Sequence, residues 1–359
     1  MPGPQRAAAE WSFALAAHRE PSLLRSLWQL FSTFSLFVAG WALMYWSLGV
    51  SYALTLLLAV PQALLLIRLF IFQHDCGHGS FFTSQRLADV VGSMLGVLTL
   101  TPYQYWKKTH AIHHATSGDL DHRGFGDIDT LTIDEYFARS RWGRLKYRVY
   151  RHPLVLFGIG AVLHFFVRHR LTAGVPRAWT RERRSILYTN AALALVVLAG
   201  MAAVGPAPFL MVQLPFTLIS CSIGVWLFYV QHQFEPTYWE HTGRWRYHAA
   251  ALEGSSFYDL PPVLRWFTGN IGLHHVHHLN ARIPNYRLQE AFAAHPELHQ
   301  VTRLTLRSSL QCLSLALWDE RANRLVSFGE ARQIHSPSVP YRPVTVPCAA
   351  PNNALKISL

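Results

Sequence analysis

The sequence predicts an all-α integral membrane protein in which four transmembrane helices form two hairpins and a helical cap lies on the cytoplasmic side. Three observations lead to this fold class. The chain of 359 residues is 51% hydrophobic and only 14% charged, whereas about a quarter of the residues of a soluble protein are charged. Two long stretches contain no Asp, Glu, Lys or Arg. Outside these stretches, histidines cluster in three short groups.

The first uncharged stretch, residues 26–67, is long enough for two helices. One helix of that length would extend about 60 Å, which is twice the roughly 30 Å hydrocarbon core of a bilayer. A turn is expected at residues 47–51, so the spans are placed at about 26–48 and 52–72. Pro61 falls inside the second span, where it is tolerated as a kink.

The second uncharged stretch, residues 185–234, also fits a helical hairpin. A Gly-Pro-Ala-Pro run at 205–208 divides it, which predicts spans at about 186–204 and 208–230.

Two shorter apolar stretches, residues 88–100 and 154–167, are each closer to half a crossing than to a whole one. They are expected to be interfacial or re-entrant. A full crossing at 88–100 would place the histidine groups before and after it on opposite faces of the membrane.

Basic residues decide the predicted orientation. They crowd the connection between the two hairpins, and both hairpin turns lack them. Both chain ends and the central connection are therefore predicted to be cytoplasmic. The net charge of +12 is attributed to contacts with anionic lipid headgroups, and no nucleic acid partner is expected, because no basic nucleic-acid-binding signature occurs.

One membrane domain is expected over residues 26–328. Residues 1–25 would form a cytoplasmic N-terminal segment. The C-terminal tail, residues 329–359, contains several prolines and is expected to be irregular.

The three histidine groups follow helical spacing. The first is a pair four residues apart, and each of the others has the spacing i, i+3, i+4, which places its members close together on a helix. All three groups lie in segments predicted to be cytoplasmic. Their members are His74, His78, His110, His113, His114, His274, His277 and His278.

The number of imidazoles favours two metal ions. Eight exceed the four ligands of a closed zinc site and the three of a catalytic one, although imidazole alone does not choose among iron, copper, zinc and nickel. His232, just after the last span, is the candidate ninth ligand. His275 would project to another side of its helix and is left out. His164, His241 and His248 are expected to pack or to contact headgroups.

Acceptors for the second imidazole nitrogen are also expected, since a metal-bound histidine usually donates its other N–H to a carboxylate or carbonyl. Each nearby carboxylate could instead pair with an arginine, and Asn270 could reach a metal or cap a helix. The carboxylate candidates are Asp75, Asp119, Asp121, Asp127, Asp129, Glu235 and Asp259.

At these groups the sequence resembles the membrane fatty acid desaturase family, whose pattern is H-x3-H, H-x2-HH and H-x2-HH. The resemblance covers about residues 26–328 and looks most like bacterial acyl-lipid desaturases of the delta-5/omega-6 type. It is carried by HDCGH at 74–78, HAIHHATSG at 110–118 and GNIGLHHVHHLNARIPNY at 269–286.

The resemblance implies a non-haem di-iron centre in the cytoplasmic cap. Two iron ions (Fe2+/Fe3+) would be held by the eight group histidines, with His232 as an additional ligand. Dioxygen would be the co-substrate, and a cis double bond would be introduced into an acyl chain of membrane lipid. The expected location is the bacterial cytoplasmic (inner) membrane, with the active site on the cytoplasmic side.

The electron donor is expected to be a separate protein. Desaturases with a fused cytochrome b5 domain carry an HPGG motif, and here only His152-Pro153-Leu154 and His295-Pro296-Glu297 occur. For a bacterial member the resemblance implies a ferredoxin or flavodoxin, ahead of cytochrome b5.

Other functions stay open from the residues alone. A di-iron membrane hydroxylase or ketolase acting on an alkane, acyl chain or carotenoid uses similar groups. A metal transporter would place ligands along the spans, which are nearly free of them, and a membrane zinc hydrolase would contain no iron. Aromatic residues near the groups could line a substrate tunnel or form an interfacial belt; they are Tyr103, Tyr105, Trp106, Phe257, Tyr258, Trp266 and Phe267.

Overall fold

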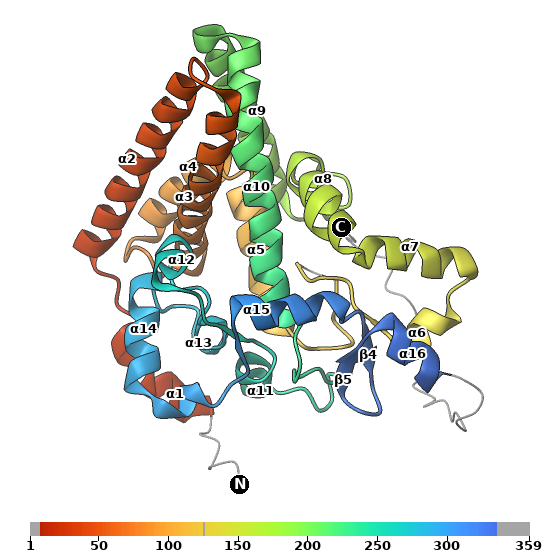
Figure 1. Ribbon diagram of the computed structural model, residues 1–359. Coiled ribbons are helices and arrows are strands. Elements are labelled where there is room, and N and C mark those ends of the chain that lie inside the picture. The colour runs from red at the N-terminus through yellow and green to blue at the C-terminus, as the bar shows by residue number, and fades with distance from the viewer. Residues whose placement is uncertain (1–7, 125, 336–359) are drawn as a thin grey trace.

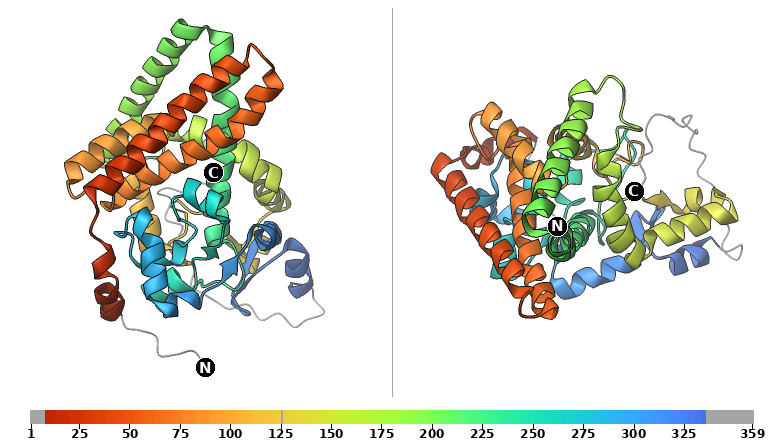
Figure 2. Two further views of the ribbon diagram at one scale, coloured as in Figure 1. Left: turned by 60° about the vertical axis from the view of Figure 1, so that its left-hand side comes forward. Right: turned by 90° about the horizontal axis from the view of Figure 1, so that it is seen from above.

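Four long helices form one end of the molecule and shorter elements form the other. The computed structural model describes residues 8–124 and 126–335, and Figures 1 and 2 show this division from several sides. The long helices are apolar enough to cross a membrane. They are α2 (Leu23–Ser47), α3 (Tyr52–His78), α9 (Thr180–Val204) and α10 (Pro206–His232).

α3 is the central helix of this end. It packs against both α2 and α10, through a core that includes Phe37, Leu66 and Phe216. In the most apolar 18-residue stretch of α3, 56% of the residues are buried. In the corresponding stretches of α2 and α9, 17% and 11% are buried. The outer helices therefore leave their apolar side chains exposed, as a lipid environment requires.

α3 extends beyond its predicted end and reaches the first histidine group. It continues through Pro61 to His78 and ends at Gly79, whose positive φ of 67° provides the left-handed residue that commonly closes a helix. α10 starts with Pro206 at its first position, contains Pro215 and ends at His232. Two membrane-type helices thus carry histidines at their last residues.

The two shorter apolar stretches are helical. Residues 88–100 fall mostly in α4 (Gln85–Leu98), and 154–167 fall in a π-helix, η2 (Leu154–Gly160), followed by α8 (Ala161–Phe166). The chain bends by 74° between α7 (Arg141–Arg151) and this second segment.

Two of the remaining described helices, α5 and α13, carry histidine groups. α5 packs against α3 and α9, and α13 packs against α11 and α14. Near the N-terminus, Trp11 and Leu15 are buried in the same core as Leu288. These remaining helices are α1 (Ala8–Ala14), α5 (Tyr103–Thr116), α6 (Ile133–Ala138), α11 (Tyr247–Leu252), α12 (Pro262–Phe267), α13 (His274–Leu279), α14 (Asn285–Ala294) and α15 (Leu306–Ser309), with 3-10 turns η1 (Ala16–His18), η3 (Arg168–Arg170), η4 (Pro296–His299) and η5 (Leu310–Ser314).

The described residues are mostly helical, as predicted, and they also form short strands that were not predicted. In one sheet β4 (Leu317–Asp319) pairs in parallel with β1 (Leu131–Thr132) and antiparallel with β5 (Arg324–Val326). β2 (Phe257–Tyr258) pairs in parallel with β3 (Arg303–Leu304). Strands of two or three residues are too short to show an alternating pattern in the sequence.

The expected irregular tail, residues 329–359, begins instead with a helix, α16 (Phe328–Ile334). Its start is fixed by a capping box: the Ser327 side chain accepts from the backbone of Glu330, and the Glu330 side chain accepts from the backbone of Ser327. Residues 336–359 of the predicted tail, and residues 1–7 of the predicted N-terminal segment, lie outside the described residues.

Candidate metal centre

The nine predicted histidines converge in two adjacent groups. In each group the nearest nitrogens all lie within 4.8 Å of one another. Four helices supply them: α3, α5, α10 and α13. Group one comprises His74, His78, His110, His114 and His277, and group two comprises His113, His232, His274 and His278.

The spacing of the histidines explains this division. Residues four apart on a helix share a group, as His110 and His114 do on α5. The residue at i+3 points to the other group, which is where His113 lies. On α13 the assignment is reversed, since His274 and His278 belong to group two and His277 to group one. The adjacent pairs His113-His114 and His277-His278 thus each serve both sites.

Three of the histidines have acceptors that fix their ring orientation. Asp127 Oδ1 lies 2.5 Å from His113 Nδ1, and Gly254 O lies 3.1 Å from His232 Nδ1. His74 Nδ1 lies 3.1 Å from Asp75 Oδ1. The other Asp75 oxygen accepts from both the backbone and the side chain of Asn285, at 2.8 and 2.9 Å. Such contacts orient a metal ligand and set its tautomer.

The Nε2 atoms face one another at the separation expected around a metal ion. Because His113 and His232 donate through Nδ1, each Nε2 carries a lone pair, and these two atoms lie 3.1 Å apart. Two such lone pairs repel unless a cation lies between them. Two nitrogens bonded at right angles to one metal, each at about 2.1 Å, lie about 3 Å apart.

The same spacing recurs in both groups. His274 Nε2 lies 2.9 Å from His232 Nε2, and His114 Nε2 lies 3.1 Å from His110 Nε2 and 3.0 Å from that of His277. The donor set present therefore fits bound metal ions in each group.

The histidines outside the spans are held in the neutral form that binds a metal. Burial lowers their pKa well below the usual value of about 6.5, and neighbouring histidines lower it further. Protonation would place several positive charges in one small volume, so neutral pH leaves the lone pairs available. These residues are His110, His114, His274, His277 and His278.

The predicted set of carboxylates is only partly at the site. Asp75 and Asp127 contact histidines of the groups, as described above. Asp259 forms an ion pair with Arg303 instead. Asp119 and Asp121 bond to His122 and His241.

The other predicted polar residues near the groups have different partners. Glu235 accepts from the backbone of Leu325, and the Asp129 carbonyl accepts from Tyr147. Asn270 belongs to neither group, and its side chain donates to the carbonyl of Asn285 at 3.2 Å. His275 packs against Phe257 and Phe292.

Sequence reasoning did not identify Asn285 and Gly254 as contributors. Asn285 lies in the NARIPNY run, and only the fold brings it to Asp75. The Gly254 contribution is a backbone carbonyl, which no residue type signals.

Trp106 adds a further contact to group one, stacking on His110 with centroids 4.5 Å apart. Gly77 makes room for it, since a Cβ at that position would lie 2.9 Å from the Trp106 ring.

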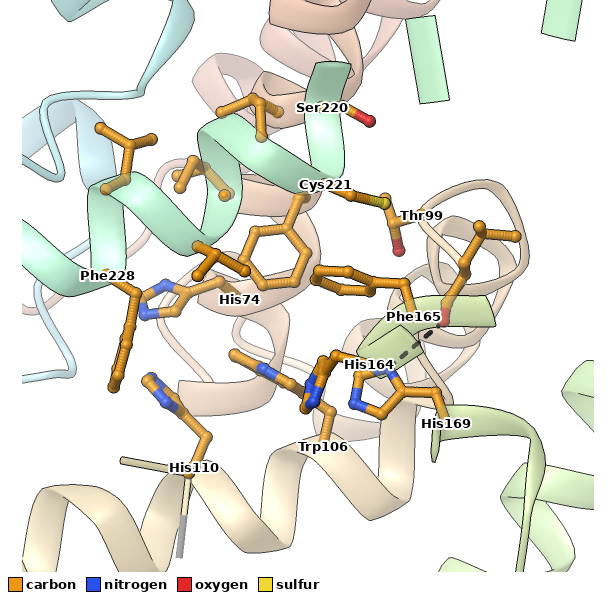
Figure 3. A pocket seen from close by; sticks show the side chains of 18 of the residues that line it. His74, Thr99, Trp106, His110, His164, Phe165, His169, Ser220, Cys221 and Phe228 are labelled. Carbon is orange, nitrogen blue, oxygen red and sulfur yellow. Dashed lines mark hydrogen bonds between the residues drawn. The ribbon is translucent and has the colours of Figure 1, made fainter. Parts of the chain in front are cut away.

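An apolar cavity adjoins the two groups. Figure 3 shows its walls between α3, α10, α5 and α8. His74 and His110 of group one and His274 of group two line it. Of the aromatic residues proposed for a tunnel, Tyr105 and Trp106 line this cavity, whereas Tyr103, Phe257, Tyr258, Trp266 and Phe267 are not among its lining residues.

Comparison with known proteins points to one family. Residues 50–308 match the family model described as fatty acid desaturase. A fatty acid desaturase of Bacillus subtilis is 47% identical over 94% of this chain and 93% of its own length. An sn-1 acyl-lipid omega-3 desaturase (ferredoxin) of Synechocystis is 27% identical over 77% of this chain and 76% of its own. A Delta(12) fatty acid dehydrogenase of Crepis alpina is 29% identical over 64% of each.

Proposed function

Because this chain belongs to the fatty acid desaturase family of oxidoreductases, we propose that it desaturates an acyl chain of a membrane lipid. Two hydrogens are removed from adjacent methylenes, giving a cis double bond. One dioxygen accepts these two hydrogens together with two electrons and two protons and leaves as two waters. The electrons come from a separate donor protein.

The observation that carries this proposal is the contact between the cavity and both histidine groups. His74 and His110 bring group one to the cavity wall, and His274 brings group two. Most of the remaining lining side chains are aliphatic or aromatic, including Leu66, Ile71 and Phe228. A hydrocarbon chain in this cavity would lie beside both groups.

Two iron ions are the proposed occupants of the groups. Group one offers five imidazoles, more than the four ligands of a closed zinc site, and group two offers four. Imidazole is a good ligand for iron. When bound, iron supplies the activation of dioxygen that no side chain provides. The nine histidines are proposed as its ligands.

The protein's own contribution is to place the acyl chain and to exclude water from the site. His113, His274, His277 and His278 are at most 2% exposed, so bulk water does not reach the donor atoms. Cavity walls that fit the chain would hold chosen methylenes beside the histidines, which is needed because neighbouring methylenes are chemically alike.

In the membrane, we propose two helical hairpins, α2–α3 and α9–α10, with the other elements as a cap on the cytoplasmic side of a bacterial inner membrane. Exposed apolar side chains on α2 and α9, such as Phe31 and Leu195, support contact with lipid. The exposed basic residues of α7, including Arg141 and Lys146, support a cytoplasmic location for the cap.

The proposed electron donor is a ferredoxin or flavodoxin. The name of the Synechocystis relative specifies ferredoxin for that protein. An acidic donor of this kind would be attracted to the exposed basic residues of α7.

Expression in a host that lacks desaturases tests the proposal. New double bonds located by mass spectrometry in the host lipids are the expected result. Purified protein should contain about two irons per chain, and activity removed by an iron chelator should return with Fe2+ and not with Zn2+. Hydroxylated or ketone products, or zinc in place of iron, would contradict the proposal.

A further inference from the structure

The cavity has a second polar region, beside the one formed by the two histidine groups. His164 on α8 and His169 on η3 line it, with ring centroids 4.2 Å apart. Figure 3 shows both rings beside Phe165, opposite Cys221 and Thr99. Neither histidine belongs to group one or group two.

His169 is fixed in place by the backbone. Its Nδ1 donates to the carbonyl of Leu100 at 3.3 Å, and its ring packs nearly perpendicular to that of Tyr105, with centroids 6.1 Å apart. Since Nδ1 carries the proton, Nε2 is left as an acceptor. The ring is 3% exposed, so it is a rigid part of the wall against which the His164 ring rests.

His164 has an unsatisfied polar atom. Its Nδ1 is fully enclosed and has no hydrogen-bond partner among the described residues. Its Nε2 is not enclosed in this way and also has no partner among the described residues, so Nε2 is the ring atom that a ligand in the cavity can reach. Leaving such a group unpaired costs about 1–3 kcal/mol, a cost that a ligand with a polar atom would remove. The ring packs against Phe165 and His169 in an apolar cavity, which favours its uncharged form and suits a neutral partner better than a phosphate.

An acyl chain has one neutral polar acceptor, the carbonyl of the ester or thioester that joins it to its carrier. We propose that the carbonyl of the acyl ester accepts a hydrogen bond from His164, with His169 as the residue that positions the His164 ring. This assignment rests on the proposed desaturase function. It makes the two histidines positioning residues that fix the reacting methylenes relative to the carboxyl end.

The carbonyl site lies close to group one. Tyr105 contacts His169, and the next residue, Trp106, stacks on His110. From Tyr105 to His110 the helix α5 rises about 7.5 Å. A chain anchored at His164 would therefore present methylenes near its carboxyl end, and not its methyl end, to group one.

The outer face of α8 indicates where the ester comes from. Leu163 and Val167 flank His164 in sequence and are 51% and 45% exposed. The helix thus turns apolar side chains outward while His164 lines the cavity, as expected for a wall between the cavity and lipid. We therefore assign the carbonyl to an ester of a bilayer lipid.

The first test varies chain length in the intact enzyme. Saturated acyl chains that differ by one methylene are supplied to wild-type cells, and each double bond is located. The proposal requires a constant distance from the carboxyl end. A position that stays constant from the methyl end overturns it. If cells that express the wild-type enzyme form no double bond at all, the proposed desaturase function is itself wrong.

The second test removes the hydrogen bond. His164→Leu should lower the selectivity for the main double-bond position about tenfold, the factor expected for one hydrogen bond of about 1.4 kcal/mol. His164→Gln keeps an N–H donor and should restore part of that selectivity. Leu163→Ala, on the outer face of α8, is the matched control and should behave as wild type. Unchanged selectivity in His164→Leu protein that retains its iron would refute the assignment.

His169→Leu gives an independent test if the His164→Leu protein does not accumulate. It should scatter the double-bond position in the same way. An unaltered position would overturn the assignment. Purified enzyme is also offered phospholipid in vesicles or acyl-CoA. Turnover of the vesicle lipid is expected, and turnover of acyl-CoA alone would assign the carbonyl to a thioester and refute the lipid ester.

Discussion

The imidazole rings of His114 and His278 stack face to face, with centroids 4.0 Å apart and an interplanar angle of 13°. They come from different helices, α5 and α13, and belong to different groups. The two groups are therefore in direct contact through this pair of rings, and a change in either ring alters the surroundings of the other group.

His278→Ala should show this dependence. The substitution removes one nitrogen from group two and the stacking partner of His114, so the iron content should fall by at least about half and desaturation by at least about 100-fold. The apolar packing of the long helices is unaffected, so the protein should still accumulate in the membrane. Metal analysis and product analysis of the same preparation measure both effects.

His275→Leu is the matched control, since His275 is buried on the same helix and packs against Phe257 and Phe292 without joining a group. Iron content and activity should stay within a few-fold of wild type. Equal losses in the two variants would show that the effect of His278→Ala is a general disturbance of α13.

Asp127→Ala should weaken metal binding without removing a ligand. Asp127 accepts from His113 Nδ1, and loss of such a partner typically costs 10- to 100-fold in metal affinity or activity. Asp127→Asn should be milder because its amide oxygen can still accept. Iron retention during a chelator titration measures the difference. Asp259→Asn is the control, because the Asp259 carboxylate pairs with Arg303, and it should retain iron as the wild type does.

Gly224→Leu should obstruct the cavity. A Cβ at Gly224 meets only Ile67 within 4 Å, at 3.7 Å, and both residues line the cavity. The larger side chain is expected to reduce desaturation of long chains at least about tenfold while iron content stays unchanged. Ser222→Leu, two residues earlier and about 200° around the helix, should have little effect; a similar loss there would argue against steric blocking.

Glu235→Gln should change the pH dependence of stability. Burial raises the pKa of Glu235 to about 7, although the Leu325 backbone N–H opposes the shift. A raised pKa means that the folded state holds the proton more tightly than the unfolded state. The resulting stabilisation is complete below the unfolded pKa of about 4.3 and is lost as pH rises to about 7.

Thermal unfolding of detergent-purified protein between pH 5 and 8 would measure this effect. The wild-type melting temperature should fall over that interval, and the Glu235→Gln melting temperature should fall less. Glu330 is a useful contrast, because hydrogen bonds from Ser327 lower its pKa. Its stabilising contribution should be present at neutral pH and lost on acidification, the opposite direction.

The long helices could be read from the sequence because lipid imposes a simple requirement of length and apolarity. α2 begins within three residues of its predicted start, and α9 extends six residues earlier than predicted, through the charged run Thr180–Arg184. The charges ended the hydrophobic pattern there, but they do not end a helix.

The convergence of the nine histidines was predictable, whereas the group that each helix's histidines join was not. Sequence spacing places His110, His113 and His114 near one helix face, but only the crossing of α5 and α13 decides which ring meets which partner. The roles of Asp75 and Asp127 were likewise undecided, because a carboxylate near many arginines has alternatives until the fold selects one.

The strand pairs and α16 show two other limits. β1 and β4 join chain segments far apart in sequence, and neither is long enough to signal a strand by itself. The capping box at Ser327 and Glu330 was readable, but the prolines that follow suggested an irregular tail.

The unbroken course of α3 has a consequence for how this fold can vary. One helix carries both Ile67, which touches the hydrocarbon cavity, and His74, which offers nitrogen to group one. Their separation is set by about 1.5 Å of rise per residue. A single inserted residue between them would turn one relative to the other by about 100°. An insertion or deletion in this stretch would therefore separate the cavity wall from the metal ligand, whereas exchanging side chains would alter the chain preference and leave the ligand in place.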